Sequence, residues 1–366
     1  MIQKINYKAD NSYWFTKDNV YNDVILSTRV RLLRNIINFP FEINMSDKDK
    51  QALSKSIVPL FSSHKEYSLK NYWTLDYNSL HYYQDLNLIT QNKAIVDNDL
   101  FTDIIYANKE KDRAIILNEK DHIKIISLCS GLSCDEGINK VSSIDNIIYS
   151  DKEYCHNDEF GFLTSKLNEA GSGMKISLRI FIPFIMISGE YVKLSTVLKK
   201  KNCFIKKVFP ESRKEELSSC IFDIFLNNSI EGTEEEQKEA INTIGIMVVE
   251  KERKLRDKVA DNYPTIVLNQ ISQMTGLAKD SLLLEYNQGL NIILAIKTGL
   301  ELGLLSGVTH TDLNSLCYEI KGELIRSLLY KNDITFEKDV KENDLLVQRL
   351  RTIVIQNALT GITHAN

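Results

Sequence analysis

The sequence lacks the features that mark several large classes of protein. Its 366 residues include only 5 Pro and 15 Gly, so no flexible linker or low-complexity segment divides it. The net charge of −4 and the pI near 6.0 argue against nucleic acid and against an anionic membrane surface as partners. The longest apolar run, Ile180–Ile187, is too short to cross a bilayer, and no apolar signal run opens the chain. We therefore expect a soluble, cytoplasmic protein.

The cysteine spacing predicts the state of the thiols, and the chain length predicts the number of domains. The six cysteines are scattered singly without a Cys-x-x-Cys pair, which predicts free structural thiols. A chain of this length builds a large core and is predicted to form two domains. Residues 1–230 mix strand-like and helical patterns and predict an α+β domain. Residues 231–366 begin with a capping box, Thr233 and Glu236, and continue with apolar residues at helical spacing, which predicts a helical C-terminal domain.

Hydrophobic periodicity gives individual elements within these two regions. Strands are predicted over Asp23–Arg31, Ala94–Asp97, Arg113–Leu117, Ile123–Leu128, Met174–Ile187 and Cys203–Phe209. Helices are predicted over Asp47–Phe61, Leu132–Ile148, Leu282–Leu305 and Leu313–Tyr330.

Arginine is scarce in the chain but concentrated in the segment Ser27–Arg34. This segment holds three of the eleven arginines, whereas thirty-four lysines supply the other basic side chains. A guanidinium is a planar fork that binds phosphate or carboxylate in a bidentate way, which an ammonium does not. The concentration therefore indicates a site that needs forked donors and not only positive charge.

The alternation of side chains along a strand predicts how this segment faces. Arg29 and Arg31 should lie on one face, and Leu26, Thr28 and Val30 on the other. Adjacent guanidiniums repel each other unless an anion lies between them, and a polyphosphate is the natural candidate. A strand face that is simply solvated is the alternative.

Three further segments carry chemistry that suits a nucleotide. In Asn118–Lys124, His122 could contact a base and Lys124 a phosphate. In Gly171–Lys175, two glycines let backbone N–H groups approach a phosphate closely. In Ile205–Glu211, two ammoniums stand near one carboxylate. Each segment alone is equally compatible with a charged or flexible surface turn.

The order of the motifs resembles the phosphagen kinase (ATP:guanido phosphotransferase) family. The segments that carry the resemblance are Ser-Thr-Arg-Val-Arg (27–31), Asn-Phe-Pro-Phe (38–41), Asn-Glu-x-Asp-His (118–122), and Gly-Phe-Leu-Thr-Ser (161–165) before Gly-Ser-Gly (171–173). Within the family, the chain is most similar to bacterial protein-arginine kinases in its length and its helical C-terminal region. The resemblance covers residues 22–230 and is faint beyond them.

The resemblance implies transfer of the γ-phosphoryl group of ATP, with Mg²⁺, to a guanidino nitrogen of arginine in a protein substrate. The reaction would take place on an antiparallel sheet flanked by helices. The implied nucleotide-binding residues are Arg29, Arg31, His122, Lys124, Lys175 and Lys206. The implied catalytic carboxylates are Glu119 and Glu211, and no residue is assigned to the metal. A homodimer formed by the helical region, and an adaptor or chaperone–protease partner, are further possibilities that the resemblance raises.

The chain departs from the family pattern mainly where the acceptor would bind. Lys120 replaces the second Glu of an Asn-Glu-Glu-Asp-His motif, and Lys166 replaces a reactive cysteine. Glu119, Asp121 or Glu169 would then have to supply the missing carboxylate. A pseudokinase that binds a nucleotide or a partner without turnover is the alternative. A third hypothesis limits the likeness to the fold, with some other anion bound.

Overall fold

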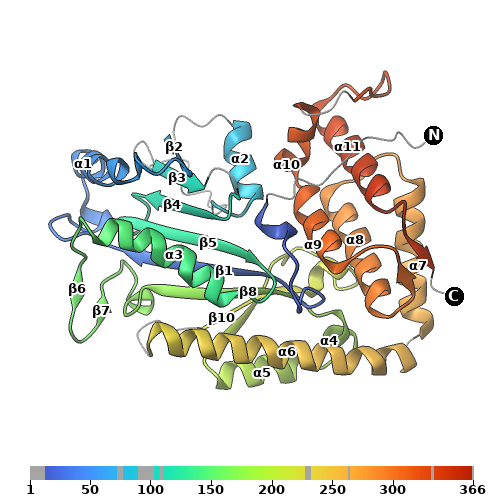
Figure 1. The fold of residues 1–366 in the computed structure, drawn as a ribbon. Helices are drawn as coiled ribbons and strands as arrows, with labels where there is room; N and C mark the ends of the chain where they lie inside the picture. The colour runs from blue at the N-terminus through green and yellow to red at the C-terminus, as the bar shows by residue number, and fades with distance from the viewer. Residues whose placement is uncertain are drawn as a thin grey trace.

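The computed structural model describes residues 13–71, 77–89, 103–107, 110–226, 232–262, 264–330 and 334–364. Its centre is an 8-stranded antiparallel sheet with the order β2-β3-β4-β5-β1-β8-β10-β9 (Figure 1). The strands of this sheet are β1 (Ile25–Arg34), β2 (Tyr67–Asn71), β3 (Asp103–Ala107), β4 (Arg113–Leu117), β5 (Ile123–Ser130), β8 (Met174–Phe181), β9 (Cys203–Lys207) and β10 (Ile221–Leu226). Two small ladders pair β6 (His156–Asn157) with β7 (Gly161–Phe162), and β11 (Leu305–Ser306) with β12 (Thr363–His364).

Helices surround this sheet and form the C-terminal region, which confirms the predicted α+β class with a helical C-terminal part (Figure 1). The α-helices are α1 (Asp47–Ile57), α2 (Tyr77–Asp85), α3 (Cys134–Tyr149), α4 (Pro183–Ile187), α5 (Tyr191–Lys200), α6 (Glu234–Asn262), α7 (Pro264–Asp280), α8 (Tyr286–Glu301), α9 (His310–Glu319), α10 (Gly322–Arg326) and α11 (Asn343–Ala358). The short 3-10 helices are η1 (Trp14–Thr16), η2 (Glu42–Asn44), η3 (Val58–Phe61), η6 (Leu167–Glu169), η7 (Leu217–Cys220) and η8 (Ser327–Tyr330). Among the described residues, no helix is both long and apolar enough to cross a membrane.

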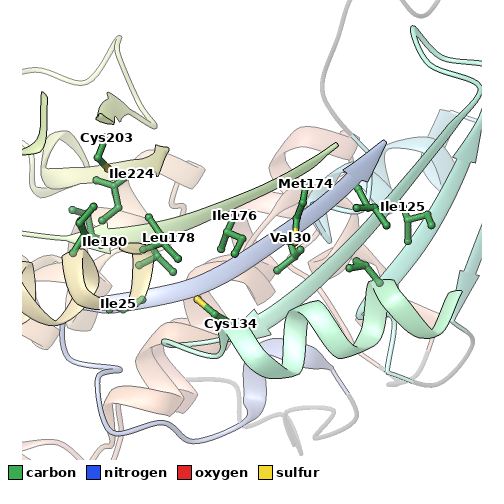
Figure 2. Close-up of a cluster of buried hydrophobic side chains, with 14 of the residues drawn as sticks. Ile25, Val30, Ile125, Cys134, Met174, Ile176, Leu178, Ile180, Cys203 and Ile224 are labelled. Carbon is green, nitrogen blue, oxygen red and sulfur yellow. The ribbon is translucent and has the colours of Figure 1, made fainter. Parts of the chain in front are cut away.

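One face of the sheet is an apolar surface covered by helices. Val30 of β1, Ile125 of β5, Ile176 and Leu178 of β8 and Ile224 of β10 are all buried in one cluster (Figure 2). The same cluster takes side chains from α1, α3, α5 and α6. Burial of apolar area stabilises a fold by about 25 cal/mol per Å², so this layer fixes the position of the central strands.

Most of the predicted elements are confirmed, with two clear exceptions. The single helix predicted over Leu313–Tyr330 is wrong, because the structure has three successive helices there, α9, α10 and η8, with a turn between α9 and α10. The strand predicted over Met174–Ile187 is wrong beyond Phe181, because Pro183 begins α4 at a position where its missing N–H costs nothing. The Glu252 carboxylate accepts hydrogen bonds from the next two backbone N–H groups, of Phe184 at 2.7 Å and Ile185 at 2.9 Å. The predicted strand Ala94–Asp97 lies outside the described residues.

Helix α6 contributes to both halves of the molecule. Its residues Ile241, Ile244 and Val248 are buried in the cluster under the sheet, whereas Val259 is buried with the C-terminal helices. The division of the chain at residue 230 therefore stays a prediction, since the first helix after that point also packs against the central sheet.

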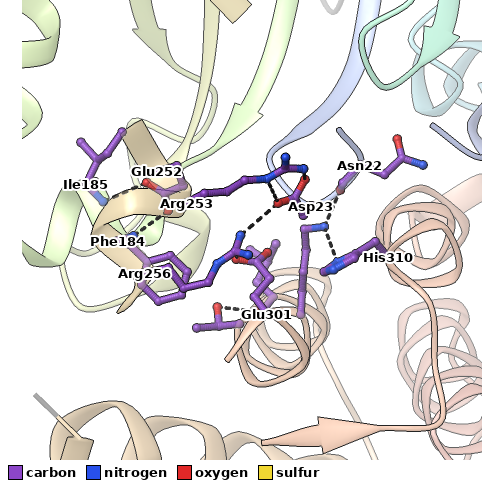
Figure 3. A network of polar contacts seen from close by, with 12 residues as sticks. Asn22, Asp23, Phe184, Ile185, Glu252, Arg253, Arg256, Glu301 and His310 are labelled. Atoms are coloured by element: carbon purple, nitrogen blue, oxygen red, sulfur yellow. Dashed lines mark hydrogen bonds and ion pairs between the residues drawn. The ribbon is translucent and has the colours of Figure 1, made fainter. Parts of the chain in front are cut away.

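A network of charged and polar side chains joins the start of β1 to the C-terminal helices (Figure 3). Asp23 accepts hydrogen bonds from Arg253 at 2.7 Å and Arg256 at 3.0 Å, both on α6. Lys297 of α8 is fully buried and donates to the carbonyl oxygen of Asn22 at 2.6 Å. The chain entering β1 is therefore held by helices that follow it by more than two hundred residues.

Candidate active site

The second face of the sheet carries a set of basic side chains. Residues paired directly across neighbouring strands point to the same face. Arg31 of β1 is paired with Lys175 of β8, and Leu33 with Lys124 of β5. Nearer the start of β1, Ser27 is paired with Arg179 of β8. Arg179 is in turn paired with Asp223 of β10, and Asp223 with Lys206 of β9. The structure thus brings Arg29, Arg31, Lys124, Lys175, Arg179 and Lys206 to one face.

The predicted sheet face is correct for the side chains of Arg29, Arg31, Thr28 and Val30 of β1, and it is wrong for that of Leu26. The pairing of β1 with β8 is irregular between Ile25 and Ser27, and this local shift turns Leu26 to the basic face. Leu26 consequently lines the same cavity as Arg29 and packs against the C-terminal helices.

A cavity of about 640 Å³ lies between this face and the C-terminal helices. The sheet contributes Arg29, Arg179, Lys206 and Asp223 to its lining. The opposite wall includes Tyr286, Tyr318 and Lys321, together with Asp85 at the end of α2. The cavity is large enough for a small-molecule ligand and combines cations with aromatic rings.

Arg29 lies in this cavity with unused hydrogen-bonding capacity. Its Nε is buried and has no hydrogen-bond partner among the described residues, and the same is true of Nε of Arg31. Burial, and after it the charge of Arg31, lower the pKa of Arg29 to about 10. Two adjacent guanidiniums with unpaired buried donors are a costly arrangement that an anion would stabilise.

Beyond the cavity, two of the cations are paired with carboxylates of the chain. Arg31 donates a hydrogen bond to Glu169 of η6, and Lys124 donates one to Glu119 at 2.6 Å. Lys175 has no such ion pair among the described residues; its Nζ lies 3.9 Å from the centre of the Phe225 ring. Burial, and after it the charge of Arg31, lower the pKa of Lys175 to about 8.

The third arginine of the segment Ser27–Arg34 is Arg34, and its contacts are structural. It lies on the far side of β1, where it donates to Asp145 of α3 at 3.0 Å and stacks 3.7 Å above the Phe162 ring. It also donates to the carbonyl oxygen of Ser172 at 2.9 Å and so fixes the glycine loop. In that loop Gly173 has φ of +65°, and a Cβ there would lie 2.6 Å from the carbonyl oxygen of Leu33.

His122 is held inside the structure and not presented to the cavity. Its Nδ1 accepts a hydrogen bond from the Ile36 N–H at 2.9 Å, and its Nε2 donates to the Pro40 carbonyl at 2.8 Å. Burial lowers the pKa of this imidazole, which favours the neutral ring that this pairing needs. Contact with a nucleotide base stays a prediction, and the observed role of His122 is to fix the loop that contains Asn-Phe-Pro-Phe.

The two predicted catalytic carboxylates are not brought together. Glu119 precedes β5, whose first residue is paired with Arg34 at the end of β1. Glu211 follows β9. The last residue of β9 lies in the same row of paired residues, across β10 and β8, as Ile25 at the start of β1. A strand of 10 residues spans roughly 30 Å. Glu211 is exposed at the far end of the sheet, so its joint action with Glu119 is not supported by this geometry.

Sequence reasoning missed two residues that the structure places in the cavity. Arg179 donates two hydrogen bonds to Asp223, with Nε at 2.8 Å and Nη2 at 3.0 Å. Asp223 is the single charged residue of β10, and Arg179 lies between Leu178 and Ile180 in β8, so a charge flanked by apolar residues was the available signal. Lys120 and Lys166, at the altered family positions, are both exposed.

The described side chains do not form a metal-binding cluster. Among the described residues, no group of three or more His, Cys, Asp or Glu side chains is arranged to hold a metal ion. The carboxylates on the basic face, Glu119, Glu169 and Asp223, are each paired with a cation of the chain.

These features define a basic face on an antiparallel sheet, whose forked donors suit an anion such as phosphate. The model of the ATP:guanido phosphotransferase C-terminal catalytic domain matches residues 45–255, more than half of the chain. The chain belongs to the ATP:guanido phosphotransferase family. The predicted resemblance is thereby confirmed.

The chain is also similar to curated proteins over nearly its whole length. The chain is 23% identical over 342 residues to the protein-arginine kinase of Clostridium acetobutylicum, a match that covers 92% of this chain and 99% of that one. It is 24% identical to the protein-arginine kinase of Syntrophomonas wolfei, over 90% of this chain and 92% of that one. Both alignments extend over nearly the whole of this chain and of each relative.

A solved structure agrees on the fold. The duplicated taurocyamine kinase of Schistosoma mansoni, with bound transition-state-analogue components, aligns with a TM-score of 0.60 at 16% identity. The alignment covers 75% of this chain and 39% of that duplicated protein.

Proposed function

We propose that this protein transfers the γ-phosphoryl group of ATP to a guanidino nitrogen of arginine in a protein substrate. The nucleoside would occupy the cavity beside Arg29 and Arg179, and the phosphates would extend along the basic face toward Arg31, Lys124 and Lys175. The observation that carries the proposal is the buried Nε of both Arg29 and Arg31 on one strand face, neither of which has a hydrogen-bond partner within the described ranges. Relatives named as protein-arginine kinases support the choice of acceptor.

The proposed reaction moves one phosphoryl group between two nucleophiles. The lone pair of a guanidino nitrogen forms the P–N bond while the bond from the γ-phosphorus to its bridging oxygen breaks. ADP leaves with that electron pair, and the proton of the attacking nitrogen passes to a carboxylate. The base is needed because free guanidinium has a pKa above 12 and delocalised lone pairs. Glu119, next to Lys124, is the proposed base.

The cations contribute by position and charge. In phosphoryl transfer, the protein mainly aligns the phosphates and neutralises charge on the transferred group. Arg31, Lys124 and Lys175 meet at the same part of the sheet, where the γ-phosphate would lie. Because the described carboxylates of this face are paired with cations, Mg²⁺ would be held by nucleotide and water oxygens and would neutralise charge on the β- and γ-phosphates.

A nucleotide-binding module without turnover is the second candidate. Lys120 and Lys166 add ammoniums where the family pattern has a carboxylate and a thiol. Both side chains are exposed, whereas the Glu119 and Glu169 carboxylates are paired with cations of the basic face.

One experiment separates the two candidates. The full-length protein is incubated with [γ-³²P]ATP, Mg²⁺ and an arginine-rich model protein, and the product is assayed for acid-labile, base-stable phosphate. We expect labelled arginine, and loss of label in Arg29→Ala. Measurable ATP binding without product at high enzyme concentration would decide for the module without turnover. Dimerisation, an adaptor or chaperone–protease partner and a cytoplasmic location stay predictions.

A further inference from the structure

The guanidinium of an acceptor is a planar cation whose complement is a pair of carboxylates. Glu119 lies at the correct end of the sheet for the γ-phosphate, whereas Glu211 lies at the opposite end. We propose that Glu169 is the second carboxylate that holds the acceptor guanidinium, and that ATP makes it available by displacing it from Arg31. This inference rests on the proposed function and adds to it the residue that receives the acceptor.

Glu169 and Glu119 reach the same part of the basic face from opposite sides. β1 lies between β5 and β8 in the sheet. Glu119 comes from the turn that precedes β5, and Glu169 comes from η6, in the loop that precedes β8. A guanidinium placed over the end of β1 would therefore have one carboxylate on each flank.

Both carboxylates now occupy positions that suit phosphate oxygens. The Glu169 side chain is 16% exposed beside an Arg31 that is 25% exposed, and Glu119 is 14% exposed beside a Lys124 that is 7% exposed. The buried Nε of Arg31 has no hydrogen-bond partner in the part of the chain that the structure describes, so a single carboxylate does not satisfy its fork. A phosphate presents more acceptor oxygens than a carboxylate and is the better partner for that fork.

The loop that carries Glu169 is held at both ends, so a displaced side chain stays near the site. Before it, the Ser165 N–H donates to the Asp121 carboxylate at 2.7 Å. After it, Gly171 and Phe162 exchange backbone hydrogen bonds of 2.8 and 3.1 Å. Only η6 lies between these points, which leaves Glu169 free to exchange partners without unfolding its surroundings.

The exchange sets an order of binding. Without nucleotide, the carboxylates neutralise the cations of the face. With ATP bound, the cations bind phosphate, and Glu169 is left partly buried without its partner, a state that a guanidinium relieves. The acceptor should therefore bind well only after ATP.

The test uses the full-length protein and the variant Glu169→Gln, with Glu159→Gln as the matched control. Glu159 is exposed in the turn between β6 and β7 and lies outside the proposed site. Loss of the competing carboxylate should tighten ATP binding by about threefold to tenfold, because the ion pair no longer has to be broken. AMP, which lacks the β- and γ-phosphates, should bind both proteins equally.

Acceptor binding is measured separately, with an arginine peptide and protein saturated with a non-hydrolysable ATP analogue. Wild type should bind the peptide at least about tenfold more tightly with the analogue than without it, and Glu169→Gln should lose this gain. Glu169→Asp should restore part of it. Weaker ATP binding in Glu169→Gln, or unchanged nucleotide-dependent peptide binding, would overturn the inference.

These binding measurements need no turnover. If wild type gives no phosphoarginine, but Glu169→Gln binds ATP more tightly and loses the nucleotide-dependent gain in peptide binding, the role of Glu169 stands and the proposed phosphotransfer fails. If wild type is active and Glu169→Gln is equally active, the phosphotransfer stands and the role of Glu169 fails.

Discussion

Lys175 should make ATP binding depend on pH near neutrality. Its pKa is lowered to about 8, first by burial and then by Arg31, while Glu169 opposes the shift. The protonated ammonium is the form that binds phosphate, so a bound triphosphate raises its pKa again. Affinity for ATP should therefore fall as pH rises through 8.

The size of the effect follows from the fraction of protonated Lys175. If only the protonated form binds, the dissociation constant scales with one plus the ratio of neutral to charged lysine. For a pKa of about 8, this factor grows about eightfold between pH 7.5 and 9.0. Phosphate itself finishes ionising at lower pH, since its second pKa is near 6.

The assay is isothermal titration calorimetry with a non-hydrolysable ATP analogue, at constant ionic strength, from pH 7.5 to 9.0. Lys175→Arg keeps its charge over this range and should give a flat profile, whereas Lys175→Met should bind weakly at every pH. A wild-type profile without slope, or the same slope in Lys175→Met, would refute the reasoning.

Three more perturbations have definite outcomes. Arg31→Ala should weaken ATP binding more than tenfold, because charge-assisted hydrogen bonds worth about 1.5–3 kcal/mol are lost; unchanged affinity by calorimetry would contradict the placement of the triphosphate. Asp23 is buried, which by itself raises its pKa, but hydrogen bonds from two arginines of α6 prevail and lower the pKa from 3.8 to about 2. The carboxylate thus adds about 2 kcal/mol of stability that is present above pH 3.8 and lost as pH falls toward 2. Urea denaturation should show Asp23→Asn less stable at pH 7 and with a smaller decline between pH 4 and 2, and equal declines would exclude this linkage. Gly173→Ala should cost about 2 kcal/mol or more in the same assay, since φ is +65° and the new Cβ would meet the Leu33 carbonyl; a neutral effect would mean that the loop relaxes freely.

Local patterns predicted most of the strands and the face of Arg29 and Arg31, because alternation along a strand depends only on neighbours in the sequence. The error at Leu26 arose from an irregular pairing with β8, which no local pattern records. The error after Phe181 arose because Ile182–Ile187 is as apolar as a strand, although Pro183 suits the first turn of a helix.

The site was harder to predict wherever it depends on partners distant in sequence. Arg179 and Asp223 meet only because β8 and β10 are neighbours in the sheet. The position of Glu211 depends on where β9 ends, and the chain order of motifs carries no information about which end of the sheet that is. Motif spacing identified the residue types of the site and left their spatial grouping to the structure.

The anchoring of β1 limits how far this chain can be shortened. The Asn22 carbonyl accepts hydrogen bonds from Lys297 at 2.6 Å and from Asn314 at 2.9 Å, on α8 and α9. A fragment that stops after α6 would expose this carbonyl and remove one wall of the cavity. β1, which carries Arg29 and Arg31, would then lose its tether at the end nearest Arg29. Expression trials that seek a minimal kinase core should keep α8 and α9, even though the family match stops at residue 255.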